Sequence, residues 1–354
     1  MAAGITTAVL AAIVIGIITV GAARLAPISQ GAFVHSYDHR VLHDGLEILL
    51  IQSDGQAFAT LARDPSLSRP DDFTSRGEAA YRAQRPLLSY LAWMGSFGRS
   101  GWVPPALAIL FVLAVAAAAT GLATLLERRR CNPWLAVGLL LLPGTYASLE
   151  YFGPEVLGLA LVVWGLIAWT PPTNRRTVVA VVLFALAGLA RETYLLVPAV
   201  LALVALPQRR FRDTAMLAAS ALPWVAWLVV VHARFGAWPT DSGQGSLGSA
   251  NPALTAVPFE GLVGALRHAP LGTVAPYAVV GALLALLAFI NRDDVLSKVV
   301  LMFGAFAAFL SEYVWSNWQF FARVLLPLYA LGFVVLFGRV LTSESSPAAA
   351  VEES

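Results

Sequence analysis

Long apolar stretches separated by short polar turns make up most of this sequence, from its first residues to about position 341. A helix needs about 20 mostly apolar residues to cross a bilayer. The pattern therefore predicts an all-α polytopic membrane protein with about ten transmembrane helices. The first stretch, 4–26, has no charged segment in front of it. We expect it to stay in place as the first transmembrane helix rather than to be removed as a signal peptide.

The apolar runs set the expected crossings. Interval 177–206 is too long for one helix and carries Arg191 and Glu192 at its centre, so it predicts two short helices that meet there. Run 86–97 is too short to cross alone and predicts a helix beside the membrane. Run 46–51 predicts a short helix at the membrane interface. The other expected crossings are 103–126, 134–149, 156–169, 214–231, 274–290, 299–314 and 323–341.

Basic residues gather in turns that fall on one face of this arrangement. By the positive-inside rule that face is cytoplasmic. Both termini are then cytoplasmic, and the protein is expected in the plasma (inner) membrane as a multi-pass protein. The basic turns are Arg128–Arg130, Arg175–Arg176, Arg209–Arg212 and Arg292 with Lys298.

The longest hydrophilic stretch, 53–85, lies on the opposite, outer face. It belongs to a first outer loop, 27–85, and a Gly- and Ser-rich second outer loop covers 235–272. We expect residues 1–341 to form a single transmembrane domain. The acidic, Ser-rich end, 342–354, is expected to be a disordered cytoplasmic tail.

Composition narrows the class further. Apolar residues make up 58% of the 354 residues and charged residues 12%, with a mean hydropathy of +0.73. Soluble domains have about 45–50% apolar and about 25% charged residues. The net charge of +2 gives no reason to expect a nucleic-acid partner, and the single cysteine, Cys131, excludes an internal disulfide.

Ionisable residues are costly near membrane helices and are candidates for function. Here they collect at the outer ends of the expected helices and on the outer segment. Arginine holds phosphate through charge-assisted hydrogen bonds, and a carboxylate can take a proton from a hydroxyl. Such a group fits a substrate with a phosphate head and a lipid tail. The candidates are Asp54, Gln56, Arg82, Gln84, Arg85, Glu150, Glu155, Arg191, Glu192, Glu312 and Arg323.

Several of these residues also have a purely structural interpretation. Arg191 and Glu192 can form an ion pair that closes two short helices. Arg323 can extend its guanidinium to the membrane surface from a helix end. Glu155 lies in a first helical turn, where the helix dipole favours an acid, and Asp54-Gly55 is typical of a turn.

Two further groups have a structural and a functional interpretation. One contains residues of metal-ligand type without a metal-site spacing, so a solvated loop is favoured: His35, Asp38, His39, His43 and Asp44. The other predicts an interfacial aromatic belt, with stacking on a sugar as the alternative: Trp315, Trp318, Phe320 and Phe321.

Several motifs together resemble the GT-C superfamily of polytopic membrane glycosyltransferases, in an uncharacterised bacterial branch. They are Asp54-Gly55-Gln56, Leu61-Ala62-Arg63-Asp64-Pro65, Ala80-Tyr81-Arg82-Ala83-Gln84-Arg85-Pro86-Leu87-Leu88, Pro154-Glu155, Leu189-Ala190-Arg191-Glu192-Thr193 and Arg323-Val324-Leu325-Leu326-Pro327. The resemblance implies a GT-C-like fold and transfer of a sugar from a polyprenyl-phosphate carrier on the outer side. It also implies that Asp54 is the base, or the group that orients the acceptor. Phe58 departs from the tyrosine that relatives often have.

We therefore expect an inverting enzyme in which Asp54 is catalytic. The acceptor is left open as a glycan, a lipid or a protein, as is the oligomeric state. We expect neither a cofactor nor a metal ligand, and a divalent cation is not required. The alternatives are a flippase for a lipid-linked saccharide and a silent GT-C-like subunit that binds lipid phosphate. The expected substrate-binding residues are Gln56, Arg82, Gln84, Arg85, Glu155, Arg191, Glu192, Glu312 and Arg323.

Overall fold

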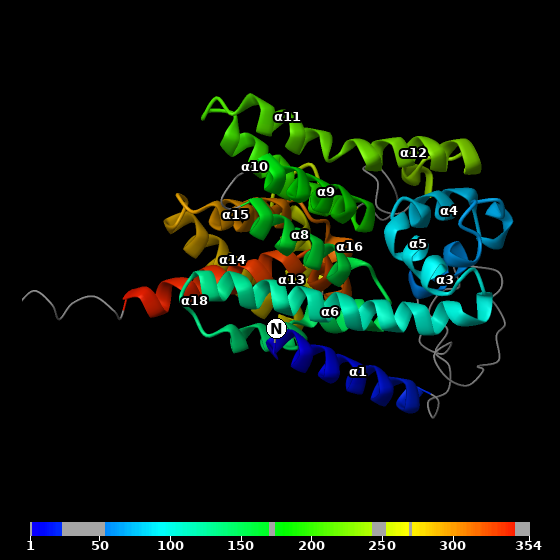
Figure 1. Cartoon of the computed structure of the whole chain (residues 1–354), viewed down its shortest axis with the longest axis horizontal. Helices are drawn as coiled ribbons and strands as arrows, with labels where there is room; N and C mark the ends of the chain where they lie inside the picture. The colour runs from blue at the N-terminus through cyan, green and yellow to red at the C-terminus, as the bar shows by residue number, and fades with distance from the viewer. Residues whose placement is uncertain (1, 23–53, 170–173, 243–252, 269–270, 344–354) are drawn as a thin grey trace, which may run out of the picture.

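A computed structural model describes residues 2–22, 54–169, 174–242, 253–268 and 271–343. Within these ranges the chain is helical throughout, apart from an isolated β-bridge between Leu254 and Leu310. The longest helix, α6 (Val103–Arg128), runs along the bundle in Figure 1. Its first turn contains prolines, whose missing N–H groups would have no partner there in any case. The described residues thus have the expected all-α architecture.

The other helices complete the bundle in chain order. Before α6 lie α1 (Ala2–Ala22), α3 (Asp54–Arg63), η2 (Pro70–Asp72), α4 (Arg76–Ala83), α5 (Pro86–Gly95) and η3 (Ser100–Trp102). After it come η4 (Pro133–Leu141), α7 (Pro143–Glu150), α8 (Glu155–Trp169), α9 (Asn174–Ala190), η5 (Glu192–Leu195), α10 (Leu196–Ala205), α11 (Phe211–Ala219), α12 (Leu222–Phe235), η6 (Pro239–Ser242) and α13 (Glu260–His268). The chain ends with α14 (Leu271–Ile290), α15 (Val295–Ala308), α16 (Glu312–Trp315), α17 (Trp318–Val324) and α18 (Leu326–Ser343).

The expected crossing 299–314 is wrong at its end, because α15 ends at Ala308 and α16 begins only at Glu312. Proline explains two other departures from the expected crossings. The run 134–149 was expected to be one helix, but it divides into η4 and α7 at Pro143. The run 323–341 is also broken, because α17 ends at Val324 and α18 begins at Leu326, just before Pro327, with a bend of 58° between them. Proline lacks the N–H that would continue an α-helix and clashes with the preceding turn. Interval 177–206 divides at Arg191 and Glu192, as expected.

Only some of these helices are long enough to cross a bilayer unaided. Among the described residues, two helical stretches are long and apolar enough to cross a membrane, Ser100–Arg128 and Phe211–Phe235. The bent pair α17 and α18 is a third if the two helices are counted as one span. Shorter apolar helices, such as α8 and α15, pack beside them. The described residues therefore include helices that can cross a membrane, and the ten crossings stay a prediction.

One end of the bundle collects the basic turns. Arg129 contacts Asp294 at 2.6 Å, which joins the end of α6 to the start of α15. Arg128 donates to the carbonyl of Ile167 in α8 at 3.1 Å. The guanidinium of Arg210, before α11, lies 5.1 Å from the ring centroid of Trp169 at the end of α8. Turns far apart in the sequence thus meet at one end.

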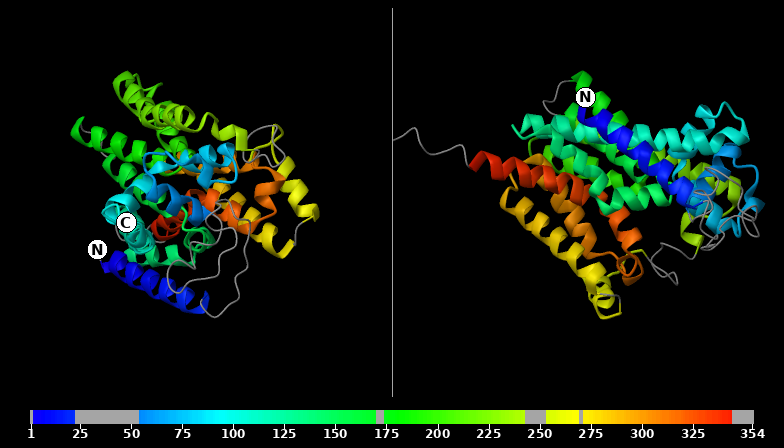
Figure 2. Two further views of the ribbon diagram at one scale, coloured as in Figure 1. Left: turned by 90° about the vertical axis from the view of Figure 1, so that its right-hand side faces the viewer. Right: turned by 90° about the horizontal axis from the view of Figure 1, so that it is seen from below.

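The segment 54–95 folds into a helical cap at the opposite end, at the right of Figure 1. Apolar side chains of α3 and α4 pack with Val231 and Phe235 of α12. Trp227 of α12 also donates its indole N–H to the carbonyl of Ala83 at 2.7 Å. Figure 2 shows α11 and α12 as an outer layer beside α9 and α10. The cap therefore rests on the end of α12.

Parts of the expected loops lie outside the described residues. These parts include 27–53, with the group from His35 to Asp44 and the short helix expected at 46–51, and the tail from 344 onwards. Where it is described, the first outer loop is helical, with α3, η2 and α4. The second outer loop, expected at 235–272, contains η6 and α13, and α14 already begins within it.

Candidate active site

Asp54 lies at the centre of a buried cluster of charges. It is the first residue of α3, and its side chain is 8% exposed. One carboxylate oxygen contacts the guanidinium of Arg82, and the other accepts from Nη1 of Arg323 at 2.7 Å. Arg82 and Arg323 come from α4 and α17, which are far apart in the sequence. The fold thus brings together residues from three helices around one carboxylate.

Arg82 is held from its other side within its own helix. Its Nε donates to Glu78, one turn earlier, at 2.6 Å. Residues at positions i and i+4 lie on the same face of a helix, which explains the contact. Ser75 caps α4 by accepting from the backbone N–H of Glu78 at 3.0 Å. The guanidinium of Arg82 therefore lies between two carboxylates.

Glu155 provides a second buried carboxylate, which is only 1% exposed. It contacts Nη1 of Arg191, and it lies 3.7 Å from Nη1 of Arg323. Tyr194 donates its hydroxyl to the carbonyl of Glu155 at 2.6 Å, which fixes the start of α8. The Oε2 atom of Glu155 has no hydrogen-bond partner among the described residues. A Cβ on Gly153 would lie 1.9 Å from that oxygen, so a larger residue there would have to displace the Glu155 carboxylate.

A third ion pair joins Arg85 to Glu192. The Nε and Nη2 atoms of Arg85 donate to the two carboxylate oxygens at 2.8 and 2.7 Å. Such a bidentate pair matches two donors to two acceptors in a fixed geometry. Arg85 is 7% exposed, whereas Glu192 is 25% exposed and is the most accessible acid of the cluster. The predicted alternative, an ion pair between Arg191 and Glu192, is wrong, because each residue pairs with another element.

Aromatic and amide groups support Arg323. Its guanidinium lies 4.4 Å from the ring centroid of Tyr151 and donates to the carbonyl of Gln319 at 3.2 Å. Tyr151 donates its hydroxyl to the side chain of Gln319, which in turn donates to Glu150 at 2.8 Å. A cation over an aromatic face is attracted to it, more strongly when water is excluded. Arg323 is 6% exposed, so the alternative of a surface anchor is wrong.

The cluster is balanced in charge. Burial alone would raise the pKa of the Asp54 carboxyl, but Arg82 and Arg323 outweigh it and hold the pKa well below its ordinary value. Burial of Arg85 is likewise outweighed by Glu192, and its pKa is raised. Four guanidinium groups (Arg82, Arg85, Arg191 and Arg323) face four carboxylates (Asp54, Glu78, Glu155 and Glu192).

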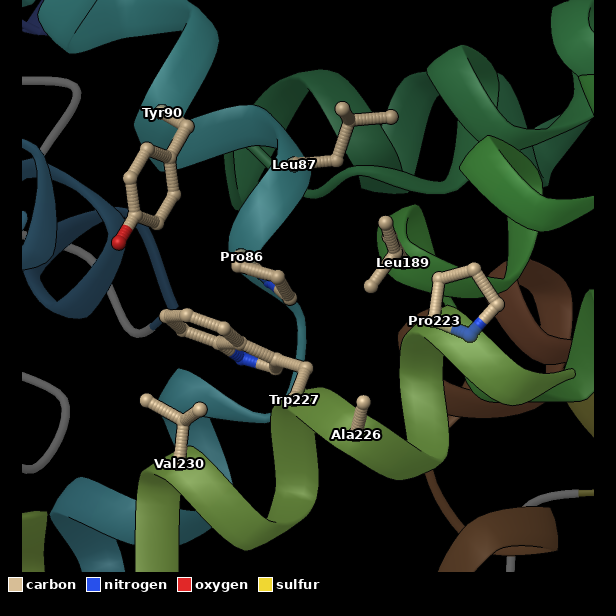
Figure 3. A pocket seen from close by; sticks show the side chains of 8 residues that line it. All are labelled: Pro86, Leu87, Tyr90, Leu189, Pro223, Ala226, Trp227 and Val230. Atoms are coloured by element: carbon tan, nitrogen blue, oxygen red, sulfur yellow. The ribbon is translucent and has the colours of Figure 1, made fainter. Parts of the chain in front are cut away.

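An apolar groove of about 430 Å³ adjoins the cluster between α5, α9 and α12. Figure 3 shows the lining side chains Pro86, Leu87, Tyr90, Leu189, Pro223, Ala226, Trp227 and Val230. Two of the lining residues lie close in sequence to the Arg85–Glu192 pair, since Pro86 directly follows Arg85 and Leu189 is three residues before Glu192. Volumes of about 300–1,000 Å³ are usual for small-molecule sites. Exposed apolar residues of α12, such as Val225 and Val229, lie beside it.

The chain matches no protein-family model, no curated protein and no solved structure. The GT-C resemblance therefore stays an expectation from the motifs. Among the described residues no group of three or more His, Cys, Asp and Glu side chains is placed to hold a metal ion. The geometry of the charged cluster and of the groove is the basis for any assignment of function.

Most of the sequence-predicted residues meet in this cluster, but not all. Gln56 and Gln84 are buried in the cap, in α3 and at the end of α4. Glu312 instead pairs with His268 of α13 at 2.7 Å, where both side chains are exposed. Glu150 reaches the cluster only through Gln319. Among the acidic candidates, Glu312 thus pairs outside the cluster, with a histidine instead of an arginine.

Some residues of the charged cluster were not predicted from the sequence, and the predicted role of some aromatic residues is wrong. Glu78 was not singled out, although its spacing from Arg82 is that of a helical ion pair. Tyr151 and Gln319 carry no such local signal, because their role depends on the packing of α7 against α17. The expected aromatic belt is wrong for Trp315 and Phe321, which are buried with ring centroids 5.2 Å apart.

Proposed function

We propose that this chain is a membrane glycosyltransferase that moves a sugar from a polyprenyl-phosphate donor to an acceptor on the extracytoplasmic side, within a GT-C-like bundle of about ten spans. The observation that carries the proposal is a buried cluster of paired arginines, one of which, Arg85, directly precedes Pro86 in the lining of an apolar groove. Guanidinium groups bind phosphate in a planar, bidentate way. An apolar chain attached to that phosphate would lie in the groove, with the rest of a long chain in the bilayer.

The reaction we propose is a displacement at the anomeric carbon of the sugar. The acceptor hydroxyl attacks this carbon, and a new carbon–oxygen bond forms as the bond to the phosphate oxygen breaks. The lipid phosphate leaves with the bonding electron pair, and the hydroxyl proton passes to a carboxylate. Arginines placed in advance around the departing phosphate stabilise its charge in the transition state.

The environment of Asp54 adds a condition to its proposed role as the base. A general base works best when its pKa is near the working pH, and the paired Asp54 is far below it. Asp54 gains basicity only when Arg82 or Arg323 turns to another anion. Binding of the donor phosphate supplies such an anion. Donor binding and activation of the acceptor are therefore coupled in this scheme.

The direct test uses the purified protein in nanodiscs with a panel of polyprenyl-phosphate sugars and bacterial lipid and glycan acceptors. We expect release of polyprenyl phosphate together with a glycosylated product. The variant Asp54→Asn is expected to lower the rate by about 10²-fold or more. The matched control is Asp71→Asn, which removes an exposed carboxylate from the same segment. Equal rates in Asp54→Asn and the wild type would remove Asp54 from the mechanism.

The donor site is tested separately by Arg323→Lys. Lysine keeps the positive charge but loses the planar fork that contacts Asp54 and lies over Tyr151. We expect the Michaelis constant for the donor to rise at least several-fold, with that for the acceptor nearly unchanged. The reverse pattern would place Arg323 on the acceptor side.

A further inference from the structure

Because the cluster is neutral, an additional anion cannot enter it without displacing a carboxylate. Each arginine already has an acidic partner in this structure. Removing a partner from a buried charge is costly unless another anion takes its place. The least costly exchange is at the acid that water already reaches. That acid is Glu192, which is 25% exposed, whereas Asp54, Glu78 and Glu155 are 8%, 6% and 1% exposed.

Glu192 also has the geometry of a stand-in for phosphate. Its two oxygens accept from Arg85 at 2.7 and 2.8 Å, which is how two phosphate oxygens bind one guanidinium. The pair is close in sequence to the lining of the apolar groove, because Arg85 directly precedes Pro86 and Glu192 follows Leu189 by three residues. An anion bound there can therefore extend a chain into the groove. An anion without such a chain gains nothing from the groove to offset the loss of Glu192.

We infer that Glu192 is a selectivity residue, which occupies the phosphate position on Arg85 and yields it only to phosphates that carry a long apolar chain. This inference rests on the proposed function, since it assigns the lipid phosphate of the donor to Arg85. Arg82 and Arg323 keep their contacts with Asp54 until the donor is bound. Free phosphate and water-soluble phosphates are excluded by the same carboxylate.

The test measures equilibrium binding of farnesyl phosphate, butyl phosphate and farnesol to the full chain in nanodiscs, without any transfer reaction. We expect the wild type to bind farnesyl phosphate and to bind butyl phosphate too weakly to detect. In Glu192→Gln, which removes the competing charge, affinity for both phosphates should rise by roughly tenfold. Farnesol binding should be unchanged, because it depends on the groove alone.

Two further variants complete the design. Arg85→Gln should weaken farnesyl phosphate binding about tenfold or more and leave farnesol unaffected. Asp213→Asn is the matched control for the loss of one negative charge, because Asp213 pairs with Arg210 at 2.7 Å at the far end of the bundle. It should bind every ligand as the wild type does. If Glu192→Gln fails to fold, Glu192→Asp, with a shorter side chain that cannot pair as closely, should also strengthen binding.

Unchanged or weaker phosphate binding in Glu192→Gln, in a wild type that binds farnesyl phosphate, overturns the inference and leaves the proposed function standing. Failure of the wild type to bind farnesyl phosphate overturns the inference as well. The proposed function has its own readout in sugar transfer, so the two failures are distinguished.

Discussion

At the scale of single residues, the most sensitive group is Glu155. Its carboxylate is almost completely buried and contacts two arginines. The variant Glu155→Gln leaves Arg191 and Arg323 without this charge, and breaking a buried pair costs about 3–5 kcal/mol. We expect a clearly lower melting temperature in detergent. The control Glu312→Gln removes an acid that is 47% exposed and should change stability by about 0.5 kcal/mol or less. Equal effects of the two variants would contradict the buried network.

Acid stability is the second test at this scale. The ordinary pKa of Asp54 is 3.8, and its folded-state pKa lies well below that value. A lowered pKa means that ionised Asp54 stabilises the fold fully above pH 3.8, and that this contribution is lost as the pH falls towards the folded-state pKa. The difference in stability between the wild type and Asp54→Asn should be constant from pH 7 to 5 and shrink below pH 4. A difference as large at pH 2 as at pH 7 would contradict the ion pairing.

At the scale of helices, the close approach of α7 to α17 sets the position of Arg323. A Cβ on Gly144 of α7 would lie 2.2 Å from the carbonyl oxygen of Ala322, the residue before Arg323. Backbone cannot give way as a side chain can, so Gly144→Ala must push the helices apart. Such overpacking costs about 1–3 kcal/mol. We expect a lower melting temperature and weaker donor binding. Gly138→Ala, with open space around it, should change neither property.

Sequence reasoning located helices well and their breaks less well. The helices α6 and α14 lie close to their expected ranges, because the length and apolar composition of a run are enough to predict such a helix. The break at Arg191 and Glu192 was also visible, since two charges interrupt the run. The breaks at Pro143 and before Pro327 were missed, although proline gives a local signal. The pairing of Arg85 with Glu192 could not be foreseen, because it joins residues 107 positions apart.

At the scale of the whole molecule, the charges separate into two ends. The basic turns meet around Arg129 and Trp169, and the paired cluster lies in the cap and the adjoining helix ends. By the positive-inside rule we expect the first end to face the cytoplasm. In a Cys131→Ser background, a membrane-impermeant thiol reagent should label Asp71→Cys on intact cells. Gln208→Cys should be labelled only after the membrane is opened. The opposite labelling would reverse the orientation and place the cluster in the cytoplasm.

The paired cluster is tested most directly by determining the structure of the protein in nanodiscs with farnesyl phosphate bound. We predict the phosphate within hydrogen-bonding distance of Arg85, the chain along Pro86 and Trp227, and Glu192 turned away from Arg85. A phosphate bound elsewhere, with Arg85 and Glu192 still paired and the groove empty, would contradict the assignment of this cluster to a lipid-linked phosphate.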